Sequence, residues 1–134
     1  MNKTKKIVSS IAAVAMLTSV LCFGASAART QSGAVAGYAT AGSCLVTREA
    51  GSASTSYALN GAGDVYVDAT YIQAPLNGGT TQSQYKEKVS ATGGSVQIGY
   101  TPNNGWVSLS ISAHHRVSRS GQTWTAVTSH DGSK

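Results

Sequence analysis

The sequence predicts an all-β domain, an antiparallel β-sandwich or partly open barrel of about seven or eight strands. Three observations indicate this fold class. Beyond Ala27, successive stretches alternate apolar and polar residues with a period of two, which places one side of each strand against a core. Glycine-containing dipeptides that suit tight turns separate these stretches. No stretch beyond Ala27 carries apolar residues at the spacing of a helix.

The longest alternating stretch is 106–119, and it predicts a half-buried strand. Its aliphatic residues fall on odd positions and its serines on even positions, so the two faces differ in polarity. At about 3.3 Å per residue a straight strand of this length would extend roughly 46 Å. Because that is too long for so small a domain, we expect a bend or bulge between Ala113 and Arg116.

Three dipeptides predict tight hairpins around this strand: Gly93-Gly94, Asn104-Gly105 and Ser120-Gly121. The last two would place Tyr100 opposite Leu109 and Val117 opposite Trp124. The result would be a four-stranded antiparallel meander over about residues 81–129. The expected core residues of this meander are Val96, Ile98, Tyr100, Leu109, Ile111, Val117 and Trp124.

A second hairpin is predicted from the stretches 52–59 and 65–73, which the glycine-rich loop 61–63 connects. The segment 74–80 contains Pro75 and three turn-forming residues, so we expect it to cross between two sheets. Lys86 and Lys88 fall on the polar side of the stretch 82–91. Lysines on an exposed edge strand discourage pairing with other chains, and that is the role we expect for them.

The N-terminal segment has the pattern of a bacterial-type secretory signal peptide. Lysines at positions 3, 5 and 6 precede an apolar run over 7–23 and the sequence Ala25-Ser26-Ala27. We expect a signal-peptide helix over 1–27, cleavage after Ala27 and a secreted product. Two alternatives are lipidation of Cys22, although Leu21 stands where a lipobox has a small residue, and retention of the run as a membrane anchor.

The domain boundaries expected from this pattern are a signal peptide over 1–27, a disordered lead over 28–33, a single β domain over 34–129 and a flexible tail over 130–134. The formal net charge of the chain is +5, with ten basic and five acidic residues. Three of the basic residues lie in the signal peptide, so seven basic and five acidic residues leave +2 after cleavage. The remaining basic residues are scattered, so we expect neither a nucleic-acid partner nor membrane association after cleavage.

Cys44 and the adjacent histidines His114 and His115 are the residues whose side chains could take part in catalysis or bind a metal. Cys44 is the single cysteine after the signal peptide, so no internal disulfide can form. It could be a buried small hydrophobe, an intermolecular disulfide partner, or a nucleophile activated by a histidine. His114 and His115 point to opposite faces of a strand and do not bind one metal unless a bulge turns both to one side. We expect His115 to be structural, His114 to lie on the surface, and the protein to carry no metal or other cofactor.

The candidate binding residues are Trp106, Tyr66, His114 and Arg116. Trp106 and Tyr66 fall on the more polar faces of their strands, where an aromatic ring can stack on a sugar or anchor a protein. The alternative for Trp106 is that its ring packs over Pro102 or a loop. The expected partner is an extracellular protein or carbohydrate.

These patterns predict a small secreted bacterial protein that acts as a non-catalytic extracellular binding module. The sequence has no G-x-S-x-G motif of the kind that marks a nucleophilic serine, and we expect no enzymatic activity. Three alternatives stay open: a bacteriocin-like antagonist, a small hydrolase that uses Cys44 and His115, and a structural component of a coat or matrix.

Overall fold

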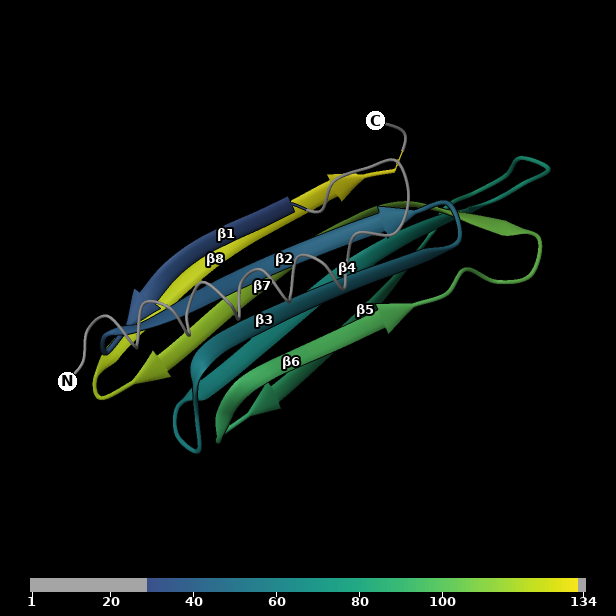
Figure 1. Ribbon diagram of the computed structural model, residues 1–134. Helices are drawn as coiled ribbons and strands as arrows, with labels where there is room; N and C mark the ends of the chain where they lie inside the picture. Colours follow the sequence, from purple (N-terminus) through teal and green to yellow (C-terminus); the bar gives the residue numbers. More distant parts are fainter. Residues whose placement is uncertain (1–28, 133–134) are drawn as a thin grey trace.

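The computed structural model describes residues 29–132. The predicted signal peptide and its helix lie outside the described residues, as do residues 133 and 134. Within the described range the fold is all-β, with eight antiparallel strands in two sheets (Figure 1). No helix in this part of the chain is long and apolar enough to cross a membrane.

Each sheet has four strands, and the two sheets lie face to face in a sandwich-like arrangement (Figure 1). The first sheet has the order β1-β2-β3-β6 and the second has the order β5-β4-β7-β8. The strands are β1 (Arg29–Val35), β2 (Tyr38–Thr47), β3 (Ala50–Asn60), β4 (Asp64–Pro75), β5 (Gln82–Ser90), β6 (Gly93–Tyr100), β7 (Trp106–Arg119) and β8 (Gln122–Asp131).

The core lies between the sheets and is built from alternate residues of each strand. Of the core residues expected from the sequence, Val96, Ile98, Tyr100, Ile111 and Val117 are buried, and Trp124 packs half-buried against them. The full set of buried core residues is Val35, Cys44, Val46, Ala53, Tyr57, Val65, Val67, Ala69, Tyr71, Val96, Ile98, Tyr100, Ile111, Ala113 and Val117.

Rings of the second sheet lie directly on glycines of the first. The Trp124 ring lies against Gly33, the His115 ring against Gly42 and the Tyr71 ring against Gly51. A Cβ atom at any of these glycines would overlap the ring. Because these three glycines have no side chain, the first sheet leaves space that the large side chains of the second sheet fill.

One of the predicted hairpins is confirmed. The turn at Ser120-Gly121 joins β7 to β8, and Val117 pairs with Trp124 as the sequence indicated. Ser120 has a φ of 53° and Gly121 a φ of 77°. Positive φ at both central residues is the signature of a two-residue hairpin turn.

The other predicted hairpins are wrong, because their strands belong to different sheets. β6 pairs with β3 and not with β5 or β7, and β4 pairs with β5 and β7 and not with β3. Two of the crossings brace each other at one end of the sandwich: Gly61 N donates to Thr92 O and Gly93 N donates to Gly63 O, both at 2.8 Å. The first of these bonds uses Thr92 O, the acceptor that a two-residue turn at Gly93-Gly94 would have needed.

The segment expected to cross between sheets does not cross. Residues 76–81 connect β4 to β5, which are neighbours in the second sheet, and β4 extends through Pro75. Proline is tolerated there because it stands at the end of the strand.

The irregularity in β7 lies at Leu109 and not between Ala113 and Arg116, where the pairing with β4 and β8 is continuous. Ser110 pairs with Ile72 and Ser108 pairs with Gln73, so Leu109 is an extra residue, a β-bulge. The bulge reverses the alternation of the strand: Ser108 is buried, whereas Leu109 is only half-buried and does not belong to the core cluster. The core role expected for Leu109 is therefore corrected.

Both ends of the described chain are more regular than expected. Residues 29–33 were expected to be disordered, but they form most of β1, which pairs with β2 from Arg29 onward. His130, expected in a flexible tail, is a buried residue of β8. Its Nδ1 accepts a hydrogen bond of 2.8 Å from Val46 N, which lies beyond the described pairing of β1 with β2. The side chain thus supplies a partner for a backbone donor at the margin of the first sheet.

The edge strand β5 has the opposite phase to the one expected. Lys86 pairs with Ala69 and Lys88 with Val67, so the lysines lie on the side of β5 that faces the other sheet. Lys86 Nζ donates to Gly99 O of β6 at 2.6 Å and lies 4.8 Å from the centre of the Tyr100 ring. Inward-pointing charges of this kind discourage an edge strand from pairing with another chain. Val89 and Glu87 of the same strand face outward.

Candidate functional site

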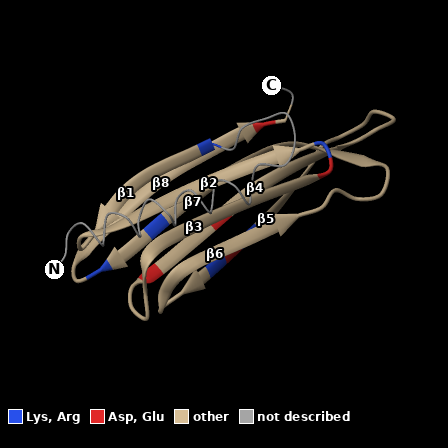
Figure 2. Cartoon of the chain, viewed as in Figure 1, with Lys and Arg blue, Asp and Glu red and all other residues tan. Residues whose placement is uncertain are grey.

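The outer surfaces of the two sheets differ in chemistry. Strands β2, β3 and β6 carry no charged residue (Figure 2). Their register places a set of uncharged and mostly small residues on the outer side of the first sheet: Ala41, Ser43, Leu45, Ser52, Ser54, Ser56, Ser95, Gln97 and Gly99. The outer side of the second sheet instead combines aromatic, acidic, basic and imidazole groups, so it is the face with recognition chemistry.

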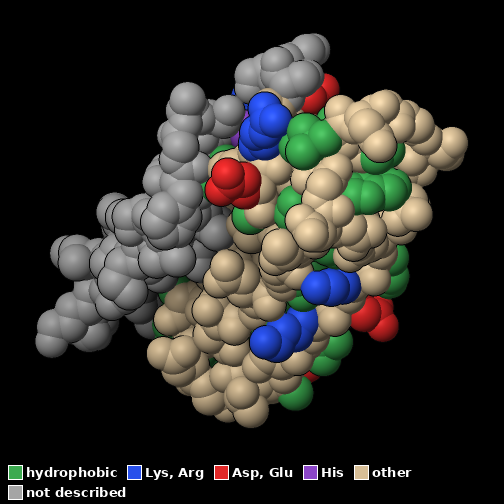
Figure 3. Space-filling view, turned by 90° about the vertical axis from the view of Figure 1, so that its right-hand side faces the viewer, with side chains coloured by type: hydrophobic (Ala, Val, Ile, Leu, Met, Phe, Trp, Pro, Cys, Tyr) green, Lys and Arg blue, Asp and Glu red, His purple; other side chains and the backbone are tan. Residues whose placement is uncertain are grey.

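Basic groups do not gather into one patch on the part of the surface that Figure 3 presents. Lys and Arg side chains lie there among apolar, acidic and other groups (Figure 3). This end of the molecule therefore offers no continuous positive surface.

We call the central group of side chains on the outer side of the second sheet the outer cluster; it comprises Tyr66, Asp68, Tyr85, Glu87, His114 and Arg116. The pairing of the strands brings these residues together. Asp68 of β4 lies between Glu87 of β5 and His114 of β7, and Arg116 lies opposite Tyr66. Directly paired residues of antiparallel strands project on the same face and contact each other.

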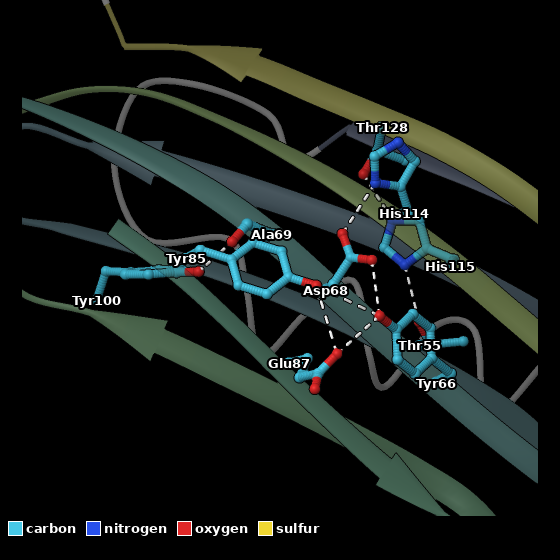
Figure 4. A network of polar contacts seen from close by, with 10 residues as sticks. All are labelled: Thr55, Tyr66, Asp68, Ala69, Tyr85, Glu87, Tyr100, His114, His115 and Thr128. Atoms are coloured by element: carbon cyan, nitrogen blue, oxygen red, sulfur yellow. Dashed lines mark hydrogen bonds and ion pairs between the residues drawn. The ribbon is translucent and has the colours of Figure 1, made fainter. Parts of the chain in front are cut away.

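Hydrogen bonds hold the outer cluster in one arrangement (Figure 4). The Tyr66 hydroxyl donates toward Asp68 Oδ2 at 2.8 Å and toward Glu87 Oε2 at 3.1 Å, and Tyr85 donates to the same Glu87 oxygen at 3.4 Å. His114 Nδ1 lies 2.8 Å from Asp68 Oδ1. The guanidinium of Arg116 stacks 4.7 Å from the centre of the Tyr66 ring. The polar groups are therefore ordered before any ligand arrives.

The surroundings of Tyr66 favour its protonated form. Hydrogen bonds to Tyr85 and Asp68, then partial loss of solvent, the hydrogen bond to Glu87 and the charge of Asp68, raise the pKa of the Tyr66 hydroxyl well above its ordinary value. A phenolate beside two carboxylates would be repelled by both of them. Tyr66 is thus a hydrogen-bond donor throughout the physiological range.

An open hollow of about 530 Å³ adjoins the outer cluster between β4, β7 and β8. It is lined by Tyr66, Asp68, His114, His115, Arg116, Thr125, Ala126 and Val127. Large apolar side chains are exposed on the same face: Tyr85 is 58% exposed, Val89 65% and Val127 57%. Exposed apolar groups beside ordered polar groups are typical of a recognition surface.

The structure brings together three of the four binding residues expected from the sequence. Tyr66, His114 and Arg116 belong to the outer cluster. Trp106 does not, because it lies at the other end of β7, opposite Pro75. The bulge at Leu109 places Trp106 on the side of the buried Ser108, and Trp106 is half-buried.

Sequence reasoning missed Asp68, Tyr85 and Glu87. Asp68 of β4 shares the outward phase of Tyr66, and no pattern of its own singles it out. The signal for Tyr85 and Glu87 was the alternation of large outward groups at 85, 87 and 89 in β5. It was overlooked because β5 was paired with β6, which placed Glu87 on the apolar side of its strand.

A second polar group lies inside the sandwich around His115 (Figure 4). His115 Nδ1 lies 2.8 Å from Thr55 Oγ1 on the first sheet, and its Nε2 lies 2.7 Å from Thr128 Oγ1 on β8. The ring is buried, and loss of solvent, with a smaller effect of the neighbouring His114, lowers the pKa of His115 to about 4. The imidazole is therefore neutral near pH 7 and links the two sheets.

The two histidines point to opposite faces, as the alternation of β7 predicted: His115 inward to Thr55, His114 outward to Asp68. Among residues 29–132, no group of three or more His, Cys, Asp or Glu side chains is arranged to hold a metal ion. The local geometry thus gives the histidines separate partners.

Cys44 lies near the same interior group. It is fully buried and unpaired, and burial raises the pKa of its thiol, although a hydrogen bond from Thr128 acts in the opposite direction. Thr128 thus contacts both Cys44 and His115. A buried thiol with a raised pKa is a poor nucleophile.

Cys44 should not react with iodoacetamide in the folded protein and should react fully after denaturation, because the thiol has no access to solvent. Peptide mapping by mass spectrometry after labelling in buffer and in guanidinium chloride would measure the two extents. Rapid labelling of Cys44 under native conditions would contradict the burial described here and would revive a nucleophilic role.

Comparison with known protein families and with curated proteins found no match to this chain.

Proposed function

We propose that this protein is a small secreted, non-catalytic binding module and that the outer side of the β5-β4-β7-β8 sheet is its site for an extracellular glycan. The observation that carries the proposal is the contrast between the two outer faces. Exposed Tyr85, Val89 and Val127 surround an ordered group of hydrogen-bonding side chains on one sheet. The outward positions of the other sheet hold uncharged and mostly small residues, and several of them, such as Ala41, Ser43 and Ser54, are buried. Export is proposed from residues 1–27.

The chemistry of the face suits a sugar. A pyranose ring has an apolar side that stacks on an aromatic ring, and Tyr85 offers an exposed one. Its hydroxyls need acceptors, which Asp68 and Glu87 supply, and donors, which Arg116 supplies. Because the carboxylates are already held by Tyr66, binding would immobilise few additional groups.

The rival proposal of a hydrolase that uses Cys44 and His115 has less support. Both side chains are buried between the sheets, and a substrate would have to open the core to reach them. The outer face requires no such opening.

Replacing Tyr85 with alanine should weaken binding to glycan at least about tenfold, because an exposed aromatic anchor commonly contributes more than about 1.4 kcal/mol. The measurement is cosedimentation with insoluble cell-wall glycan, followed by titration with the oligosaccharides that an immobilised panel identifies. The melting temperature of the variant should stay close to that of the parent, since the ring is on the surface.

Leu76→Ala is the matched control. Leu76 is 57% exposed, close to the value for Tyr85, but it lies in the β4–β5 connection outside the outer cluster. Leu76→Ala should bind like the parent. If Tyr85→Ala also binds like the parent, or if the parent binds no glycan, the proposed function is wrong.

A further inference from the structure

The outer cluster holds two carboxylates that share one hydroxyl group. Asp68 and Glu87 are directly paired across β4 and β5. Both accept from the same Tyr66 hydroxyl, at 2.8 and 3.1 Å, and one proton cannot satisfy both oxygens fully at once. Like charges on directly paired residues of a sheet repel each other. This part of the face therefore has an excess of negative charge.

The basic side chains nearby do not remove this excess. Lys86 and Lys88 flank Glu87 in the chain but lie on the opposite side of β5, where Lys86 binds Gly99 O. The Arg116 guanidinium stacks on the Tyr66 ring, and no lysine or arginine of the part that the structure describes forms an ion pair with Asp68 or Glu87. Asp68 instead pairs with the imidazole of His114.

The same face is negative in a chain of positive net charge. The register places Asp64, Asp68 and Glu87 on it with one arginine, Arg116, whereas the whole chain has a formal net charge of +5, or +2 without residues 1–27. Charges more than about 8 Å from a ligand are largely screened at physiological salt, so the local carboxylates decide what binds.

We propose that the outer cluster selects glycans that carry protonated amino groups, such as polymers rich in de-N-acetylated hexosamine; this inference rests on the proposed function. An ammonium group has three donors and no acceptor. Beside Tyr85 and Glu87 it meets a carboxylate oxygen, a phenol oxygen and the face of an aromatic ring, all of which attract a cation. An N-acetylated sugar has no such charge and presents a bulkier group at the same position.

The exposed apolar residues around the cluster are consistent with this ligand. Tyr85 and Val89 on β5 and Val127 on β8 flank the carboxylates on both sides. A sugar whose amino group reaches Glu87 would place its ring carbons over Tyr85 or Val89 of the same strand, so that charge and apolar contact act on the same unit. Val127 lies three strands away and would contact a further unit of the glycan.

The test compares glucosamine oligosaccharides with their fully N-acetylated counterparts of the same length, by calorimetric titration of the purified protein. The parent should bind the glucosamine form about fivefold or more tightly, and added salt should reduce the difference. Glu87→Gln, which keeps the shape and removes the charge, should lose the preference. Glu49→Gln makes the same change in the exposed β2–β3 turn and should retain it.

Each other outcome overturns the inference in a different way. Equal binding of both forms, sensitive to Tyr85→Ala, refutes the charge selection and leaves the proposed function intact. Binding of neither form refutes both. A preference that survives in Glu87→Gln places the selection elsewhere, and tighter binding of a lysine-rich peptide than of either sugar replaces the glycan with a protein partner.

Discussion

Replacing Gly42 with alanine should destabilise the fold by roughly 3 kcal/mol, at the upper end of what overpacking a core usually costs. The new methyl group would overlap the His115 ring. The ring cannot turn away freely, because Thr55 and Thr128 hold its two nitrogens at 2.8 and 2.7 Å. For a domain of about this size, the loss corresponds to a fall in melting temperature of roughly 12 °C or more.

Gly99→Ala is the control for this substitution. Gly99 lies in β6 of the same sheet, and a Cβ atom built there meets no other atom within 4 Å. The melting temperature of Gly99→Ala should stay within a few degrees of that of the parent. Adding His115→Ala to Gly42→Ala should recover part of the loss, because the obstructing ring is gone. Equal melting temperatures for Gly42→Ala and the parent would show that β2 and β7 are not packed as described.

Acid should destabilise the protein through His115, by roughly 3 kcal/mol between about pH 6.5 and pH 4. The pKa of this buried imidazole is lowered from 6.5 to about 4 in the folded state. Above pH 6.5 the ring is neutral in both states and the contribution to stability is fully present. As the pH falls below 6.5, His115 binds a proton in the unfolded chain but stays neutral in the folded one. The free energy of unfolding therefore decreases until the folded ring also titrates near pH 4.

Urea denaturation at a series of pH values would measure this effect. His115→Gln keeps a side chain that can donate and accept but does not titrate, so its stability should depend much less on pH over this window. His114→Gln, on the exposed face, should retain the dependence of the parent. Burial also lowers the pKa of His130, which contributes in the same direction. A parental pH profile in His115→Gln would assign the acid sensitivity to other groups.

The positions of the strands could be predicted from the sequence because alternation and glycine turns are local signals. Strand β7 was expected at its observed bounds, Trp106–Arg119. The register of the β7–β8 hairpin followed from Ser120-Gly121 for the same reason.

The pairing of strands could not be predicted in this way. Alternation tells which residues of a strand face the core, but two strands that face each other across a core show the same agreement as two strands of one hairpin. Ile98 and Ile111 are both inward residues, yet their strands belong to different sheets. The apolar match between them was real, and the hydrogen-bonded neighbour inferred from it was wrong.

Because strand pairing could not be predicted, only part of the candidate site could be inferred from the sequence. Tyr66, His114 and Arg116 could be placed on a polar face from their own strands. Glu87 and Tyr85 could not, because their side depends on β5 pairing with β4. The bulge at Leu109 had a similar effect on Trp106, since one extra residue reverses the face of every residue before it.

The crossings between the sheets also determine when the molecule can fold. Gly51 of β3 pairs with Tyr100 of β6, and Asp64 of β4 pairs with Ser118 of β7. Each sheet thus closes around partners that are distant in the chain, and a topology dominated by such pairs folds in roughly milliseconds to seconds. During synthesis the first sheet cannot be completed before β6 has emerged, nor the second before β8, so the earlier strands wait for partners that are made later.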